Sequence, residues 1–170
     1  SAAAKEITGA QCGPYTFRTM VPTPATAKAL VPHLLERGNN WYFLTGDYAW
    51  GHDIHETYLN YLTEAGGTEL GFDPIPVGTS DYSSYILKVR QANPSVVVVG
   101  LGGSDLVNFL KQWTEFGMKD GPLVTTPIVG DSSIWPLGNG SATGLYTKQW
   151  NYTDQGNNAA EVEFTAAFIE

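Results

Sequence analysis

The 170-residue sequence is poor in cysteine and in basic residues: Cys12 is its single cysteine, and nine Lys and Arg stand against 17 Asp and Glu. One thiol cannot form a disulfide within the chain, and a lone thiol without a matching histidine is more often inert than nucleophilic. A net charge of −8 without a Lys/Arg cluster argues against nucleic acid and anionic membrane surfaces as partners. No apolar run has the length of a membrane span. Small molecules and proteins are therefore the partners to expect.

The composition that remains is that of one globular domain. Hydrophobic residues make up 42% of the chain and charged residues 15%, enough for a core that needs neither a metal ion nor a disulfide. The chain starts at Ser1 without a methionine and stops at Glu170 inside a helical pattern. We therefore expect it to be a piece of a longer protein, and the partner of Cys12 could lie in another part.

Residues 41–53 organise the rest of the sequence. An apolar run over 41–45 is followed by Gly46-Asp47, by Tyr48 and Trp50 in a polar loop, and then by an amphipathic stretch. This pattern predicts a strand, a loop and a helix in thirteen residues. In an open parallel α/β sheet such a turn lies at the carboxyl edge, where ligands bind.

Strand and helix patterns alternate along the chain. We predict strands at 15–20, 41–45, 70–77, 96–99, 123–126 and 145–150, and helices at 24–36, 52–65, 82–92, 104–116, 131–137 and 159–169. Four consecutive valines at 96–99 indicate a strand that is buried on both faces, as in a parallel sheet covered by helices. Pro74 and Pro76 place the strand over 70–77 toward an edge. The predicted fold class is α/β, a three-layer doubly wound parallel sheet.

A glycine-rich turn, Gly100-Leu101-Gly102-Gly103-Ser104-Asp105, follows the valine strand and opens a helix. Such glycines are typical of a dinucleotide fingerprint, but the third glycine position holds Asp105, whose carboxylate would repel a pyrophosphate. Two readings remain open. The amides of Gly103 and Ser104, or the Ser104 hydroxyl, could meet a ligand carboxylate or hydroxyl. Alternatively, the segment is a tight turn that Ser104 caps.

Metal and nucleophile chemistry have weak support. His52, His55 and Glu56 lie one turn apart, but their spacing is not that of a zincin and no third ligand is evident. Ser-His-Asp catalysis needs a Gly-x-Ser-x-Gly elbow, which no glycine-serine segment here matches. We expect no metal and no cofactor.

Paired carboxylates are the remaining catalytic option. Four aspartates follow predicted strands or begin predicted helices and could share one sheet edge: Asp47, Asp53, Asp81 and Asp131. Acid-base work by a pair of them stays open, although helix capping explains Asp47 and Asp81 equally well.

The aromatic residues of the 41–53 stretch carry a further signal. Tyr48 and Trp50 lie in a predicted polar loop, where a ring that stacks on a ligand is plausible. The alternative is that both rings pack onto the neighbouring helix. Because the two residues are two apart, we expect only one of them to face a cleft.

Several motifs, taken in order, resemble one family. They are Phe17-Arg18-Thr19, the stretch over 43–51, Thr79-Ser80-Asp81-Tyr82-Ser83, the stretch over 99–105, Lys111-Gln112 and Phe116-Gly117-Met118. Together they are similar to the branched-chain amino acid type of periplasmic solute-binding protein, the type I extracellular receptor of an ABC importer. The resemblance covers almost the whole chain. The Asp-Tyr-Ala-aromatic-Gly form at 47–51, with Trp150-Asn151-Tyr152, is most similar to members that bind aromatic acids.

The resemblance implies a two-lobe clamp in which the chain crosses between the lobes three times. Residues 1–19 would form the end of the first lobe and a crossover, and residues 20–148 the second ligand-binding lobe. Residues 149–170 would then form the return crossover and the start of a first-lobe helix.

The resemblance also implies a binding site. In such receptors the loop matching Ser1-Ala2-Ala3 binds the ligand carboxylate through backbone amides and a hydroxyl, and the aromatic at Trp50 packs on the ligand. The turn Gly102-Gly103-Ser104 and the loop with Asp131 would line the second lobe. The family's acidic partner for an amino group falls near Pro127, which cannot take that part, so Asp131 is the candidate substitute.

The function implied is extracytoplasmic binding of a small carboxylate, either an aromatic acid or a branched-chain or apolar amino acid, by lobe closure. The partners would be that ligand and a membrane permease, with no nucleic acid. The location would be periplasmic, or extracellular with a lipid anchor. The protein would not be an enzyme. Two alternatives stay open: a ligand-sensing domain of a receptor or regulator, and a Rossmann-like or flavodoxin-like enzyme that uses Asp47 or Asp131.

Overall fold

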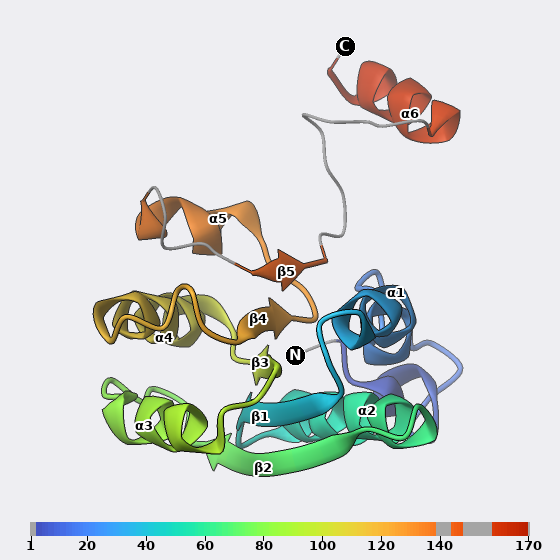
Figure 1. Cartoon of the computed structure of the whole chain (residues 1–170). Coiled ribbons are helices and arrows are strands. Elements are labelled where there is room, and N and C mark those ends of the chain that lie inside the picture. The colour runs from blue at the N-terminus through green and yellow to red at the C-terminus, as the bar shows by residue number, and fades with distance from the viewer. Residues whose placement is uncertain (1–2, 139–143, 148–157, 170) are drawn as a thin grey trace.

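The computed structural model describes residues 3–138, 144–147 and 158–169, and these form a parallel sheet with helices on both faces (Figure 1). The strands are β1 (Asn40–Gly46), β2 (Thr68–Ile75), β3 (Val96–Gly100), β4 (Leu123–Thr126) and β5 (Leu145–Tyr146). The helices are η1 (Lys5–Thr8), α1 (Thr23–Leu35), α2 (Ala49–Glu64), α3 (Ser83–Ala92), α4 (Gly103–Glu115), α5 (Asp131–Ile134), η2 (Trp135–Leu137) and α6 (Ala159–Ile169). None of the described helices is long and apolar enough to cross a membrane.

The strand order β2-β1-β3-β4-β5 confirms the predicted doubly wound architecture. Successive residues of a strand point to opposite faces, so β1 and β3 supply two separate cores. Tyr42 and Leu44 pack on one face with residues of α3 and α4. Trp41 and Phe43 pack on the other with residues of α1 and α2. The sheet is thus the middle layer of three.

The two strands singled out in the sequence have the predicted places in the sheet, although β2 begins and ends two residues earlier than predicted. All five residues of β3 are buried, and the strand pairs with β1 on one side and β4 on the other. The proline-containing strand β2 pairs with β1 alone and forms one edge of the sheet. Proline has no backbone N–H. A central strand uses its N–H groups toward both neighbouring strands, whereas an edge strand bonds on one side only, which explains the place of this strand at the edge.

The strand predicted over 15–20 is wrong. These residues form no strand, and the side chains of Tyr15 and Phe17 are 89% and 87% exposed. Alternation of aromatic and polar residues gives a strand only when a neighbouring strand supplies hydrogen bonds. No strand of the described residues lies beside this segment. The predicted strand over 145–150 is confirmed for Leu145–Tyr146, and residues 148–150 lie outside the described residues.

Several helix starts differ from the prediction. Helix α2 begins at Ala49, so Trp50 belongs to a helix and not to a loop. Helix α4 begins at Gly103 after an extended Gly102, without a side-chain cap from Ser104. Helix α1 includes Thr23, whose hydroxyl donates to the carbonyl oxygen of Ala3 at 3.2 Å instead of capping the helix. For α1 the difference arises because the carbonyl oxygen of Ala3, distant in sequence, takes the Thr23 hydroxyl.

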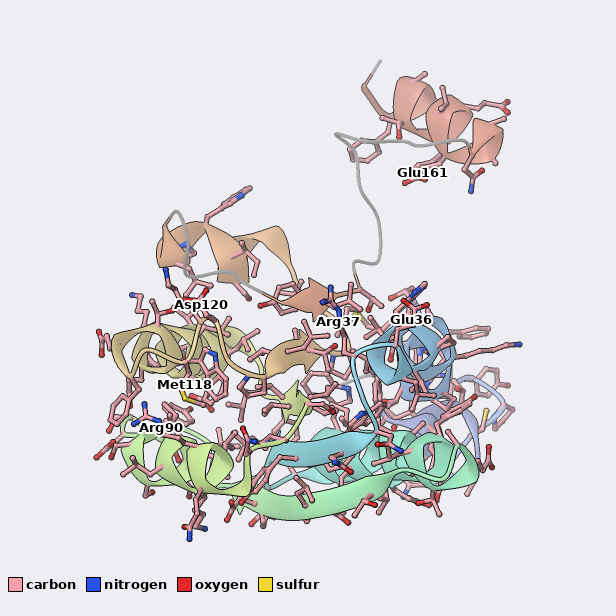
Figure 2. The ribbon with its side chains drawn as sticks, viewed as in Figure 1. Glu36, Arg37, Arg90, Met118, Asp120 and Glu161 are labelled. Atoms are coloured by element: carbon pink, nitrogen blue, oxygen red, sulfur yellow. The ribbon has the colours of Figure 1, made fainter. Side chains whose placement is uncertain are left out.

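The helices α3 and α4 are joined at their C-terminal ends. Arg90 Nε donates to the Met118 sulfur at 3.4 Å, and Arg90 Nη2 donates to the carbonyl oxygen of Phe116. Figure 2 shows the guanidinium of Arg90 beside the Met118 side chain. Because Phe116 is the C-cap of α4, this bond satisfies one of the carbonyls that a helix end leaves open.

Candidate functional site

The loops after β1 and β3 meet at the carboxyl edge of the sheet. A Cβ placed on Gly102 would lie 3.7 Å from a ring carbon of Trp50 and 3.8 Å from the hydroxyl of Tyr48. The two aromatic rings lie with their centroids 6.2 Å apart. The structure therefore brings together three of the predicted site residues, Tyr48, Trp50 and Gly102, from two strand-to-helix connections.

The two aromatic side chains differ in exposure. Trp50 is only 4% exposed, and it packs in the same cluster as Ala3 and Ala4. Tyr48 is partly exposed beside that cluster. Burial, and then the charge of the Asp105 carboxylate, raises the pKa of Tyr48, so its hydroxyl remains a neutral donor. Tyr48 thus offers the more accessible ring of the pair.

The turn Gly102-Gly103-Ser104 is exposed and adjoins a cavity of about 350 Å³. The cavity lies between the start of α4 and the α5–η2 segment, and its lining consists of Gly103, Ser104, Val107, Asn108, Ser133 and Pro136. Asp105 accepts a hydrogen bond from the Gly78 backbone N–H at 3.0 Å. Asp105, whose carboxylate is unfavourable for a nucleotide fingerprint, thus links α4 to the loop after β2.

The N-terminal loop reaches the aromatic pair. Ala3 is 1% exposed and shares a cluster with Trp50, whereas Ser1 and Ala2 lie outside the described residues. The carbonyl oxygen of Ala3 accepts hydrogen bonds from the N–H and the hydroxyl of Thr23, at 3.1 and 3.2 Å. Ala3 therefore belongs to the same buried apolar cluster as Trp50.

Asp131 begins the short helix α5, and its side chain is not among those that the structure describes. The other three aspartates of the predicted acid-base set have separate partners. Asp47 lies 2.9 Å from His52 Nε2, Asp81 accepts from the Ser83 N–H at 2.9 Å, and Asp53 accepts from the Lys5 N–H at 2.9 Å. These bonds give each of the three a structural role.

His52, His55 and Glu56, which the sequence places one helical turn apart, do not share a common partner. His55 Nε2 lies 2.8 Å from a Glu69 oxygen, and its ring stacks on Phe72 with centroids 3.7 Å apart. Glu56 pairs with the Lys5 ammonium at 2.8 Å. His52, His55 and Glu56 thus bind three different partners.

Sequence reasoning missed the residues that hold the N-terminal loop. They are Arg18, whose Nη1 donates to the carbonyl oxygen of Ala4 at 3.0 Å, together with Thr23 and Asp53. Of these residues only Arg18 lies in a motif singled out in the sequence, Phe17-Arg18-Thr19, and its role could have been suspected from it. The contact between Lys5 and Asp53 joins residues 48 apart and leaves no local pattern.

The model of the periplasmic binding protein family matches residues 1–170 of this chain, and the chain belongs to that family. The resemblance to solute-binding proteins of branched-chain amino acid ABC transporters is thereby confirmed.

Curated and solved relatives agree with this assignment. A Leu/Ile/Val-binding protein homolog 4 of Brucella abortus (strain 2308) is 26% identical over 127 residues, which cover 69% of this chain and 29% of the relative. The amino acid ABC transporter substrate-binding protein from Pseudomonas fluorescens Pf-5 is 27% identical with a TM-score of 0.83, covering 95% of this chain and 44% of that one.

A third relative shares the fold. The R. palustris ABC transporter solute-binding protein solved with 4-hydroxybenzoate has a TM-score of 0.77 at 19% identity, covering 97% of this chain and 46% of that one. The chain thus spans less than a third of the curated relative and less than half of each solved structure.

Proposed function

We propose that the whole protein is the extracytoplasmic solute-binding component of an ABC importer, and that it binds a small carboxylate by lobe closure. The observation that carries this proposal is the meeting of Tyr48, Trp50 and Gly102 at the carboxyl edge of the sheet, with Trp50 in one buried cluster with Ala3. Family membership supports the transporter role. The ligand is an aromatic acid or a branched-chain or apolar amino acid.

In this proposal each wall of the site has a separate task. Backbone amides of the Ser1-Ala2-Ala3 loop and the Ser1 hydroxyl bind the carboxylate, because amide N–H groups and hydroxyls are strong donors to an anion. Trp50 and Tyr48 form an apolar wall for the rest of the ligand. Gly102, Gly103 and Ser104 line the second lobe, and Asp131 meets an amino group where the ligand has one.

The chain is divided between two lobes. Residues 1–19 complete the first lobe and cross over, residues 20–148 form the second lobe, and residues 149–170 return to the first. Exposed aromatic side chains at both ends support this division. They include Tyr15 and Phe17 near the start, and Phe164 and Phe168, which stack with centroids 6.2 Å apart in α6. Such surfaces are expected where another lobe covers them.

Ligand binding then acts through a population shift. Contacts from both lobes favour the closed form, and the membrane permease recognises that form. The cycle requires no nucleophile, metal or cofactor. The corresponding location is the periplasm, or the outer surface of a membrane to which a lipid anchors the protein.

Calorimetry on the complete two-lobe protein tests this proposal. The panel contains benzoate, 4-hydroxybenzoate, leucine and valine, each beside its amide as the matched control. We expect at least one carboxylate to bind and its amide to bind much more weakly, because the amide lacks the negative charge. Binding of nucleotides without binding of any panel member would overturn the proposal.

A further inference from the structure

Asp53 is a buried carboxylate in the second turn of α2, and its side chain is 0% exposed. Its Oδ2 accepts from the Lys5 backbone N–H at 2.9 Å, and its Oδ1 accepts from the Thr57 hydroxyl at 3.3 Å. The Lys5 ammonium lies 3.7 Å from Oδ1. A buried charge is costly unless it is paired and hydrogen-bonded, so these partners are what stabilise Asp53 here.

Asp53 shares one face of α2 with Trp50, because residues three apart lie one above the other on a helix. Trp50 packs in the cluster that contains Ala3 and Ala4. Asp53 bonds to the backbone of the next residue, Lys5. Helix α2 is therefore hydrogen-bonded to the N-terminal loop through Asp53 and shares a buried apolar cluster with it through Trp50.

The loop backbone is held from three directions. Thr23 donates to the carbonyl oxygen of Ala3, Arg18 donates to that of Ala4, and Asp53 accepts from the N–H of Lys5. Of these three partners, Asp53 is the one on the helix that carries Trp50. Its bond is also charge-assisted, which makes it stronger than a bond between neutral groups.

We propose that Asp53 is a positioning residue for ligand binding: it fixes the Ala3-Ala4-Lys5 backbone against Trp50, so that loop and ring form one preorganised surface. The inference rests on the proposed function, which assigns carboxylate binding to this loop. Preorganisation raises affinity because less conformational freedom is lost when the ligand binds. Misplacement of a supporting group by about 1 Å is enough to weaken a site.

The Lys5–Glu56 ion pair allows a matched control. Glu56 is the nearest carboxylate to the Lys5 ammonium, at 2.8 Å, and its side chain is 61% exposed. Glu56→Gln removes this surface pair, yet it leaves both hydrogen bonds of Asp53 in place. Exposed ion pairs contribute little to stability. We therefore expect Glu56→Gln to bind like the unaltered protein.

The experiment measures Kd by calorimetry for the complete two-lobe protein, with benzoate and leucine as probes. Asp53→Ala should raise Kd about tenfold or more, because a hydrogen bond to a charged group is lost. Asp53→Asn keeps an acceptor oxygen for the Lys5 N–H and should stay within about threefold of the unaltered protein. If Asp53→Ala does not fold, Asp53→Ser, whose hydroxyl is too short to reach Lys5, takes its place.

Hydrogen exchange of the ligand-free protein separates positioning from a general loss of stability. Asp53→Ala should speed exchange at the Lys5 amide and leave the amides of β3 protected. An unchanged Kd, or a raised Kd with unchanged exchange at Lys5, would overturn the inference while the proposed function stands. Failure of the unaltered protein to bind either probe or any other panel member would overturn the proposed function and this inference with it.

Discussion

A Cβ on Gly51 would lie 1.9 Å from the carbonyl oxygen of Gly46. The first turn of α2 therefore presses directly on the end of β1, and only a residue without a side chain fits between them. This contact sets the direction in which the chain leaves the strand. Tyr48 and Trp50 lie between the two glycines in sequence, so the contact also determines their positions.

Gly51→Ala should be strongly destabilising, by about 3 kcal/mol or more, because backbone has to move to admit the methyl group. Urea denaturation of the complete protein measures this. Gly102→Ala is the matched control, since its Cβ would meet its nearest neighbour at 3.7 Å in an ordinary extended conformation. It should change stability by less than about 0.5 kcal/mol. Equal stabilities of the two variants would contradict the close approach.

Two tyrosines that are buried in the same core should respond oppositely to loss of the hydroxyl. The Tyr42 hydroxyl donates to Asp73 at 2.7 Å, whereas the buried Tyr82 hydroxyl has no partner among the described residues. Tyr42→Phe should cost about 1–2 kcal/mol. Tyr82→Phe should be neutral or stabilising, because it removes an unsatisfied polar group. Thermal or urea unfolding tests both, and destabilisation by Tyr82→Phe alone would refute the assignment.

Asp81 should make stability depend on pH in acid. Hydrogen bonds from the Ser83 side chain and backbone lower the pKa of the Asp81 carboxyl. A carboxyl with a lowered folded pKa contributes stability above its unfolded pKa of about 4, and this is lost as the pH falls through the folded value. Unfolding curves at a series of pH values should show the contribution disappearing in the unaltered protein, relative to Asp81→Asn. A difference that grows toward acid would contradict it.

Trp50→Phe should weaken binding of the best ligand of the panel several-fold, since the smaller ring offers less stacking surface, a loss of about 1 kcal/mol. Trp50→Ala is a poorer test, because truncating a buried tryptophan costs the fold about 3–5 kcal/mol. Calorimetry measures Kd, and Tyr48→Phe, which keeps the ring and loses the hydroxyl, serves as the comparison. Unchanged affinity in Trp50→Phe would remove this side chain from the site.

Most of the fold could be predicted from local patterns. The valine run of β3 indicates a buried central strand, and Pro74 of β2 indicates an edge strand. Both signals lie in the residues of the strand themselves, so they can be read locally. Helix starts were less predictable. Trp50 was expected in a loop, since nothing in its neighbourhood shows that the helix begins at Ala49.

The candidate site was predictable only in part. Tyr48, Trp50 and Gly102 each follow a strand, so topology alone brings them to one edge. The bond between Lys5 and Asp53 depends on how distant segments pack, and no spacing reveals it. The segment over 15–20 has the alternation of aromatic and polar residues that is typical of a strand. It forms none, because no neighbouring strand among the described residues pairs with it.

The position of β2 at the sheet edge has a consequence for self-association. An exposed edge invites another strand to pair with it, which is one route to aggregation. Pro74 has no N–H to offer an incoming strand, and Asp73 beside it holds its charge between Tyr42 and Lys88. A proline and a paired charge in an edge strand are both features that disfavour the addition of a further strand, so β2 is poorly suited to edge-to-edge pairing.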